Sequence, residues 1–242
     1  MQNKNRLIVS ALIPAYNEER NINQVLLLLK KSSLIDEVIC INDGSGDKTL
    51  QIVKKIPEIK IINLKKNCGK ANAIVEGLKA AKGEIVIFID ADVTGLKEDS
   101  LKKLISPLQK QTADAVIGYP IISRMDKFFK PLSGERAYFR KDLLPHLSSL
   151  KNKRWGLELH LNFLFRGKRL KIVPLQIKNT MKYKKYSYNL AAKTFFTESF
   201  DILSVMLKQK RPINYLKDSY IYPFYEKKWV VRYFFKLYDR FL

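Results

Sequence analysis

Two aspartates separated by one residue are the sharpest chemical feature of this 242-residue sequence. Asp90 and Asp92 follow the apolar run Ile85–Ile89, which is typical of a strand buried on both faces. Two carboxylates at a strand end can share a hard divalent cation and leave coordination sites free for phosphate oxygens. The same pattern occurs in turns and helix caps, so the pair alone leaves both interpretations open.

Three further polar clusters follow apolar runs, at residues 15–18, 42–47 and 67–70. Asp43 could hydrogen-bond a nucleobase or a ribose, or it could close an Asx turn with its neighbours. Lys70 follows Gly69 at a predicted helix start, where free backbone N–H groups favour an anion. An ordinary helix start has the same composition.

The elements between these clusters alternate in type. Apolar runs and helical spacing predict strands over residues 7–13, 37–41, 59–64, 84–90 and 113–118, and helices over 18–31, 69–81 and 100–109. We expect Asp47 to cap the helix that follows it. Such alternation predicts an α/β fold with a mostly parallel sheet, whose ligands bind beyond the carboxyl ends of the strands. All four polar clusters should therefore meet at one edge.

The second half of the chain is less regular. We predict helices over residues 134–144, 156–165, 191–208 and 225–242, a strand over 170–173 closed by Pro174, and a loop over 181–188. The resulting division has three parts: residues 1–120, residues 121–190 and a helical, basic extension over residues 191–242.

Composition excludes several classes of protein. Hydrophobic residues make up 46% of the chain and aromatic residues 11%, unlike a disordered protein. Two cysteines, Cys40 and Cys68, cannot form a disulfide scaffold and indicate a reduced, intracellular protein. The polar start, residues 1–6, lacks the character of a signal peptide, and no apolar run is long enough to span a bilayer.

The net charge of +22 is unevenly distributed, with +4 in residues 1–120 and +18 in residues 121–242. This asymmetry indicates an anionic partner for the second half, although a lysine-rich surface alone would give the same count. Nucleic acid is not expected, because no RNA-recognition, zinc-finger or helix-turn-helix pattern occurs.

The polar clusters together resemble family 2 glycosyltransferases. The resemblance rests on residues 13–19, 42–49, 67–73 and 90–92, in that family's order and spacing. It implies a GT-A (Rossmann-like) fold and a nucleotide-sugar donor, a UDP- or GDP-sugar. Residues 1–120 would then be the nucleotide-sugar-binding half of this fold and residues 121–190 its acceptor-binding half. It also implies the donor-binding residues Pro14, Ala15, Tyr16, Glu18, Asp43, Gly69, Lys70, Asp90 and Ala91. Asp92 and Asp90 would hold Mg²⁺ or Mn²⁺ on the diphosphate.

The resemblance also implies inversion at the anomeric carbon, which requires a base beside the acceptor and no protein nucleophile. Glu158 matches the acidic position of the acceptor-side helix, and Glu135 is the second candidate. Glu158 could instead be a pairing carboxylate that orients Arg136 or a lysine. A phosphate acceptor, already anionic, would need no strong base.

Residues 133–136 resemble the acceptor loop of polyprenyl-phosphate glycosyltransferases, such as dolichyl-phosphate mannosyltransferase, and of glucosyl-3-phosphoglycerate synthases. Ser133, Gly134 and Arg136 would then hold a phosphate-bearing acceptor, unless Arg136 pairs internally with an acid. Phosphoglycerate-type enzymes carry a metal-binding histidine in the loop that corresponds to residues 179–185, and none occurs here. Either Asp92, phosphates and water complete the metal site, or Lys182, Lys184 or Lys185 neutralise the diphosphate.

On the predicted C-terminal helix, aromatic and other apolar residues fall on one face, and basic residues recur every four positions beside it. Residues 226–242 have the composition of an interfacial anchor on an anionic membrane, and packing on the core or on a second subunit in a homodimer is the alternative. We therefore predict an inverting glycosyltransferase with a lipid-linked phosphate acceptor, peripheral at the cytoplasmic membrane face. A soluble transferase with a small phosphorylated or saccharide acceptor is the close alternative. A nucleic-acid-binding protein, a nucleotidyltransferase and an inactive sugar-nucleotide-binding protein are remote ones.

Overall fold

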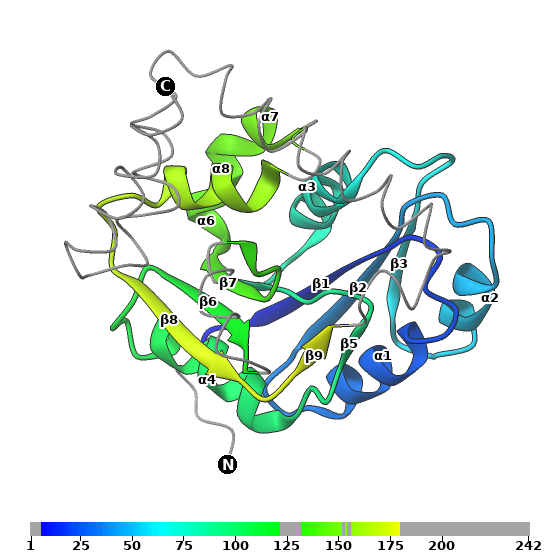
Figure 1. Ribbon diagram of the computed structural model, residues 1–242, viewed down its shortest axis with the longest axis horizontal. Coiled ribbons are helices and arrows are strands. Elements are labelled where there is room, and N and C mark those ends of the chain that lie inside the picture. Colours follow the sequence, from blue (N-terminus) through cyan, green and yellow to red (C-terminus); the bar gives the residue numbers. More distant parts are fainter. Residues whose placement is uncertain (1–5, 122–131, 152, 154–155, 180–242) are drawn as a thin grey trace, which may run out of the picture.

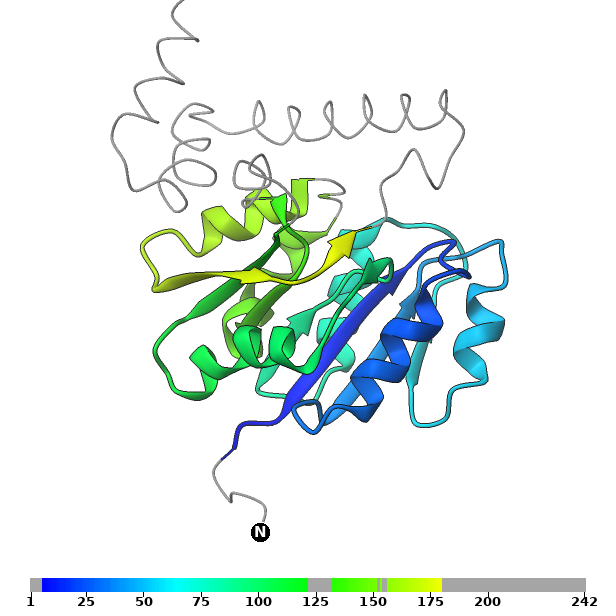
Figure 2. The same ribbon diagram turned by 60° about the horizontal axis from the view of Figure 1, so that its bottom comes forward.

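A seven-stranded sheet is the core of the molecule, in the order β3-β2-β1-β4-β7-β6-β8 (Figures 1 and 2). The computed structural model describes residues 6–121, 132–151, 153 and 156–179. The strands are β1 (Val9–Ala15), β2 (Glu37–Asn42), β3 (Lys60–Asn63), β4 (Ile85–Phe88), β6 (Ala115–Pro120), β7 (Arg136–Phe139) and β8 (Leu170–Leu175). A separate two-stranded sheet pairs β5 (Val93–Thr94) with β9 (Lys178–Asn179).

Most strand pairs are parallel. β1 pairs in parallel with β2 and β4, β2 with β3, and β6 with β8. Within the seven-stranded sheet as the structure describes it, only β7 runs antiparallel to its neighbours, β4 and β6. The carboxyl ends of β1 to β4 therefore share one edge, and the start of β7 lies at that same edge because Arg136 pairs with Phe88.

Helices cover both faces of the sheet (Figure 1). They are α1 (Ile22–Lys31), α2 (Thr49–Lys54), α3 (Lys70–Ala80), α4 (Glu98–Gln109), α6 (Arg140–Leu143), α7 (Leu147–Leu150) and α8 (Leu157–Leu164), with a 3-10 turn at Leu144–His146. Side chains alternate along β1: Ala11 and Ile13 pack with α1 and α4, whereas Leu12 packs with α3 and α8. Each layer thus buries its own apolar cluster against one face of the same strand.

The predicted elements of the first half are confirmed, with shifted ends. β1 continues through Pro14, and β8 continues through Pro174, which an edge strand tolerates because one of its sides needs no N–H donor. α1 begins at Ile22 instead of residue 18. Asp47 accepts the Thr49 N–H at 2.9 Å, one residue before the N-cap position of α2.

The helix predicted over residues 134–144 is wrong. Arg136–Phe139 is a strand, and the helical turn begins only at Arg140. Pairing on both sides with β4 and β6 supplies the backbone hydrogen bonds of this segment, and Ala137 and Tyr138 are fully covered. Tertiary packing thus overrides a helical spacing of apolar residues.

Several predictions lie outside the described residues. These are the loop at 181–188, the helices at 191–208 and 225–242, the extension 191–242, and Lys182, Lys184 and Lys185. In the part that the structure does describe, no helix is long and apolar enough to cross a bilayer.

Candidate functional site

The loops after β1 and β2 are tied together at the carboxyl edge of the sheet. The Asp43 N–H donates to the carbonyl of Ala15 at 2.8 Å, and the Gly46 N–H donates to Asn17 Oδ1 at 2.9 Å. Asn17 adopts a left-handed conformation (φ 55°), which asparagine tolerates better than most residues. Tyr16 remains 43% exposed beside these ties, where a planar ligand could reach its ring.

Asp43 joins the second loop to the third. Its two carboxylate oxygens accept the N–H groups of Cys68 and Gly69 at 2.7 and 2.8 Å. Burial raises the pKa of Asp43, although the two backbone hydrogen bonds oppose that shift. The Asp43 side chain is buried, and its two hydrogen bonds hold the backbone of the residues that precede α3. Its predicted contact with the nucleotide-sugar stays a prediction.

Lys70 bridges two carboxylates that come from distant parts of the chain. Its ammonium lies 2.6 Å from Asp90 Oδ1 and 3.0 Å from Glu158 Oε1. Burial by itself lowers the pKa of Lys70, but attraction to Asp90 and Glu158 and the hydrogen bonds to both outweigh it and raise the pKa. The predicted donor side and the predicted acceptor side therefore meet at a single cation.

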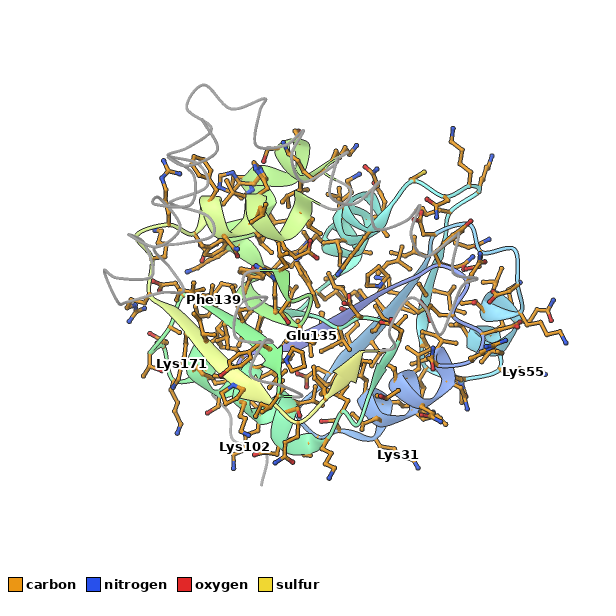
Figure 3. All side chains as sticks on the ribbon, viewed as in Figure 1. Lys31, Lys55, Lys102, Glu135, Phe139 and Lys171 are labelled. Carbon is orange, nitrogen blue, oxygen red and sulfur yellow. The ribbon has the colours of Figure 1, made fainter. Side chains whose placement is uncertain are left out.

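The loop before β7 packs directly on this ion pair, because β7 runs antiparallel to β4. A Cβ added to Gly134 would lie 2.3 Å from Asp90 Oδ2 and 2.7 Å from Lys70 Nζ. The next residue, Glu135, is fully buried and labelled near the middle of Figure 3, whereas Lys31, Lys55, Lys102 and Lys171 lie at the periphery.

Gly134→Ala is expected to weaken nucleotide binding at least tenfold, since the new methyl group must displace the Asp90 carboxylate. Isothermal titration with the nucleotide that binds the wild-type protein measures the loss. Gly46→Ala is the matched control, because no atom lies within 4 Å of its added Cβ. Unchanged affinity in Gly134→Ala would show that this loop yields freely and that its contact with Asp90 has no role in donor binding.

Glu135 occupies an unusual position for an acid. Its Oε2 accepts the Ser133 hydroxyl at 3.0 Å, and its Oε1 is buried without a hydrogen-bond partner. Burial raises the pKa of Glu135 to about 8; the nearby negative charge of Asp90 adds to the shift and Lys70 opposes it.

Glu135→Gln is expected to stabilise the fold in alkaline solution. The pKa is higher in the folded state than the usual 4.5, so the folded protein binds the extra proton between these values and loses stability as the pH rises through them. Glutamine stays neutral at every pH, so the stability of Glu135→Gln relative to the wild type should grow by on the order of 4 kcal/mol from pH 5 to pH 8.5. Urea unfolding at both pH values measures the difference, with exposed Glu58→Gln as control. An equal stability difference at both pH values would contradict the shifted pKa.

Arg136 lies in the interior, only 1% exposed. Its guanidinium donates to the Ser133 carbonyl at 2.6 Å, to the Tyr138 hydroxyl at 3.1 Å and to Asn162 Oδ1 at 2.7 Å. The sequence predicts that Arg136 holds an acceptor phosphate or pairs internally with an acid; in the structure its hydrogen bonds go to a carbonyl, a hydroxyl and an amide oxygen, and phosphate contact stays a prediction. Sequence reasoning missed both side-chain partners, because neither residue type nor spacing marks them.

The carboxylates suit a hard divalent cation. Asp90 and half-buried Asp92 supply oxygen donors, and the lack of a side chain at Gly134 lets the loop before β7 approach Asp90 without displacing its carboxylate. Among the described residues, no group of three His, Cys, Asp or Glu side chains could hold a metal by itself. A divalent ion here would therefore need ligands from a bound diphosphate or water.

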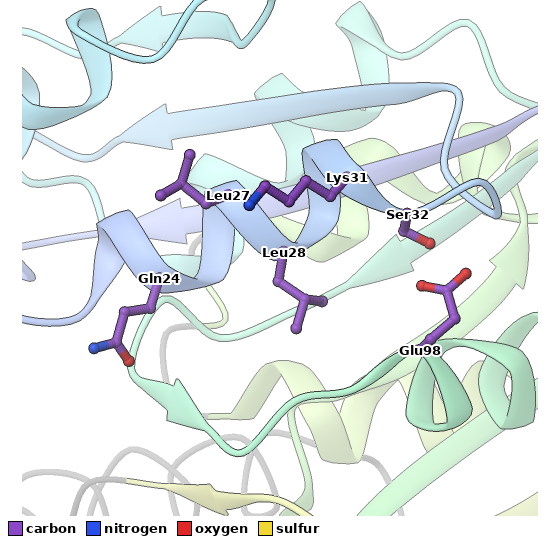
Figure 4. A pocket seen from close by; sticks show the side chains of 6 residues that line it. All are labelled: Gln24, Leu27, Leu28, Lys31, Ser32 and Glu98. Carbon is purple, nitrogen blue, oxygen red and sulfur yellow. The ribbon is translucent and has the colours of Figure 1, made fainter.

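A shallow depression of about 490 Å³ lies between α1 and the start of α4 (Figure 4). Gln24, Leu27, Leu28, Lys31, Ser32 and Glu98 line it. None of these residues belongs to the predicted site, and the depression offers no constellation of catalytic groups.

Two curated proteins have sequences similar to part of this chain. A dolichyl-phosphate beta-glucosyltransferase of Trichomonas vaginalis is 36% identical over 45% of this chain and 38% of its own length. An uncharacterised protein of Methanocaldococcus jannaschii is 34% identical over 55% of this chain and 67% of its own length. The chain thus spans only part of these curated relatives.

Solved structures show the same fold. Glucosyl-3-phosphoglycerate synthase from Mycobacterium tuberculosis, in complex with Mn²⁺, uridine diphosphate and phosphoglyceric acid, superposes with a TM-score of 0.60 at 21% identity. The match covers 79% of this chain and 78% of that one. The sequence model of glycosyl transferase family 2 matches residues 10–169. The chain belongs to glycosyl transferase family 2.

Proposed function

We propose that this protein transfers a sugar from a nucleoside diphosphate sugar to a phosphate-bearing acceptor, with inversion at the anomeric carbon. The observation that carries the proposal is the Lys70 bridge between Asp90 and Glu158. It places a carboxylate of the donor-side motif and the candidate base within reach of one ammonium group. Sugar transfer requires the groups that bind the donor and the acceptor to lie next to each other in this way.

On the donor side, the residues after β1 and β2 would hold the base and ribose. Tyr16 is exposed there, and the loop with Pro14, Ala15 and Glu18 is tied to the loop of Asp43. Gly69, Lys70, Asp90 and Ala91 would lie along the diphosphate. Mg²⁺ or Mn²⁺ held by Asp92 and Asp90 would offset the charge on the leaving nucleoside diphosphate.

On the acceptor side, Glu158 is the proposed base. It would take the proton of an acceptor hydroxyl as that oxygen attacks the anomeric carbon, and the bond to the diphosphate would break with its electron pair on the leaving group. Glu135 is the second candidate. Its raised pKa makes it the less suitable base at neutral pH, because it would already hold a proton.

A phosphate-bearing acceptor is supported by charge and by two relatives. The second half of the chain carries most of the excess positive charge. One relative is named for dolichyl phosphate, and one structural neighbour holds phosphoglyceric acid. The acceptor phosphate would lie beside Ser133 and Gly134. Because Arg136 is committed to internal hydrogen bonds, backbone N–H groups of this loop are the better candidates for phosphate contact.

A lipid-linked acceptor implies contact with a membrane. We propose that residues 226–242 bind an anionic cytoplasmic leaflet; docking of a second subunit is the alternative for this segment. Sedimentation with vesicles containing anionic lipid tests this, and removal of residues 226–242 should abolish it. Full-length protein that stays in the supernatant at low salt would contradict membrane binding and favour a small soluble acceptor.

A transfer assay tests the proposed activity. The protein is incubated with labelled UDP- or GDP-sugars, Mn²⁺, and either a polyprenyl phosphate in vesicles or 3-phosphoglycerate. We expect label in one phosphate-bearing product and inverted configuration at its anomeric carbon by NMR. Transfer with retained configuration would contradict the proposal.

A further inference from the structure

The Lys70 ammonium occupies the place where positive charge is needed in the donor site. It lies 2.6 Å from Asp90 Oδ1, a carboxylate proposed to hold the divalent ion. Gly134 closes over both groups, and an added Cβ there would meet each of them within 2.7 Å. A divalent ion that enters the site without a nucleotide-sugar must therefore approach an Asp90 carboxylate whose charge Lys70 already neutralises.

We infer that Lys70 keeps the divalent ion out of the site until the nucleotide-sugar binds. Ion binding then depends on the diphosphate of the donor. This inference rests on the proposed function, because it takes Asp90 and Asp92 as ion ligands.

Charge arithmetic supports the inference. Asp90, Asp92 and Glu158 carry three negative charges when ionised, of which Lys70 cancels one. Among the described residues, no third His, Cys, Asp or Glu side chain joins the two aspartates to form an ion site. A diphosphate brings negative charge for both cations, so it relieves their mutual repulsion and lets the ion and Lys70 occupy the site together. Donor and ion then each strengthen the binding of the other by the same factor.

Binding of Mn²⁺ without nucleotide gives the most direct test. Lys70→Met is expected to tighten Mn²⁺ binding at least tenfold over the wild-type protein, measured by electron paramagnetic resonance of free Mn²⁺ at fixed pH and ionic strength. Lys70→Arg keeps the cation and should leave binding as weak as in the wild type. Lys66→Met removes one exposed charge four residues before Lys70 in the sequence and should also change little. Asp92→Ala added to Lys70→Met should remove the tightened binding.

The outcomes separate this inference from the proposed function. If Lys70→Met binds Mn²⁺ no better than the wild type while a nucleotide still binds with Mn²⁺, the gating role is wrong and the function stands. A lysine that only stabilises the fold or only contacts nucleotide gives that result. If no form binds Mn²⁺ even with nucleotide present, both the proposed function and this inference are overturned.

Discussion

Asp92→Ala is expected to abolish sugar transfer, lowering kcat by at least about a thousandfold. A divalent ion on the diphosphate supplies several kcal/mol of charge stabilisation in the transition state, and each 1.36 kcal/mol is a factor of ten in rate. Asp92 follows β4 and is half-buried, so its carboxylate can be removed without opening the apolar core. Steady-state transfer with saturating Mn²⁺ measures the loss.

The matched control is Asp99→Ala, an exposed aspartate that pairs with Lys103 on the surface of α4. Both variants should melt within a few degrees of the wild type. Asp99 is a surface residue, where substitutions cost about 0.5 kcal/mol or less, and removal of the half-buried Asp92 carboxylate leaves the apolar core closed. Normal turnover by Asp92→Ala would contradict the metal assignment. Lost turnover together with a collapsed melting temperature would mean that Asp92 is structural.

Glu158→Gln is expected to lower kcat about a hundredfold or more for an acceptor that attacks through a hydroxyl group. General base catalysis contributes factors of this size, and glutamine keeps the shape while losing the basic oxygen. With a polyprenyl phosphate at pH 8 the loss should stay below tenfold, because that nucleophile is already anionic. Donor affinity should change less than threefold in either case.

Glu76→Gln is the control for this substitution, because Glu76 pairs with Lys79 on the exposed side of α3. A loss of nucleotide binding in Glu158→Gln without a slower chemical step would contradict the role as base. Glu158 would then serve only to hold Lys70, with which it forms a salt bridge at 3.0 Å.

Residues 1–120 could be predicted closely because their signals are local. Continuous apolar runs mark β1 and β4, and each polar cluster follows its strand directly in the sequence. Parallel pairing then brings the clusters to one edge without any further information. The structure confirms this placement for Asp43, Lys70 and Asp90.

The described part of residues 121–190 could be predicted less well because its contacts are distant in sequence. The strand Arg136–Phe139 has only four residues, and its partners β4 and β6 define it. Lys70 and Glu158 are 88 positions apart, and no spacing rule predicts their contact. Arg136 looks like a surface residue by type, yet Tyr138 and Asn162 accept its hydrogen bonds in the interior.

Nucleotide binding tests the central claim most directly, because it requires no knowledge of the acceptor. The melting temperature is measured with UDP-, GDP-, CDP- and dTDP-sugars, each with and without Mn²⁺. We predict that at least one donor stabilises the wild-type protein with Mn²⁺, by mass action, and that Asp92→Ala loses this stabilisation. If no donor stabilises the folded protein at millimolar concentration with Mn²⁺ or Mg²⁺, this edge of the sheet is not a nucleotide-sugar site.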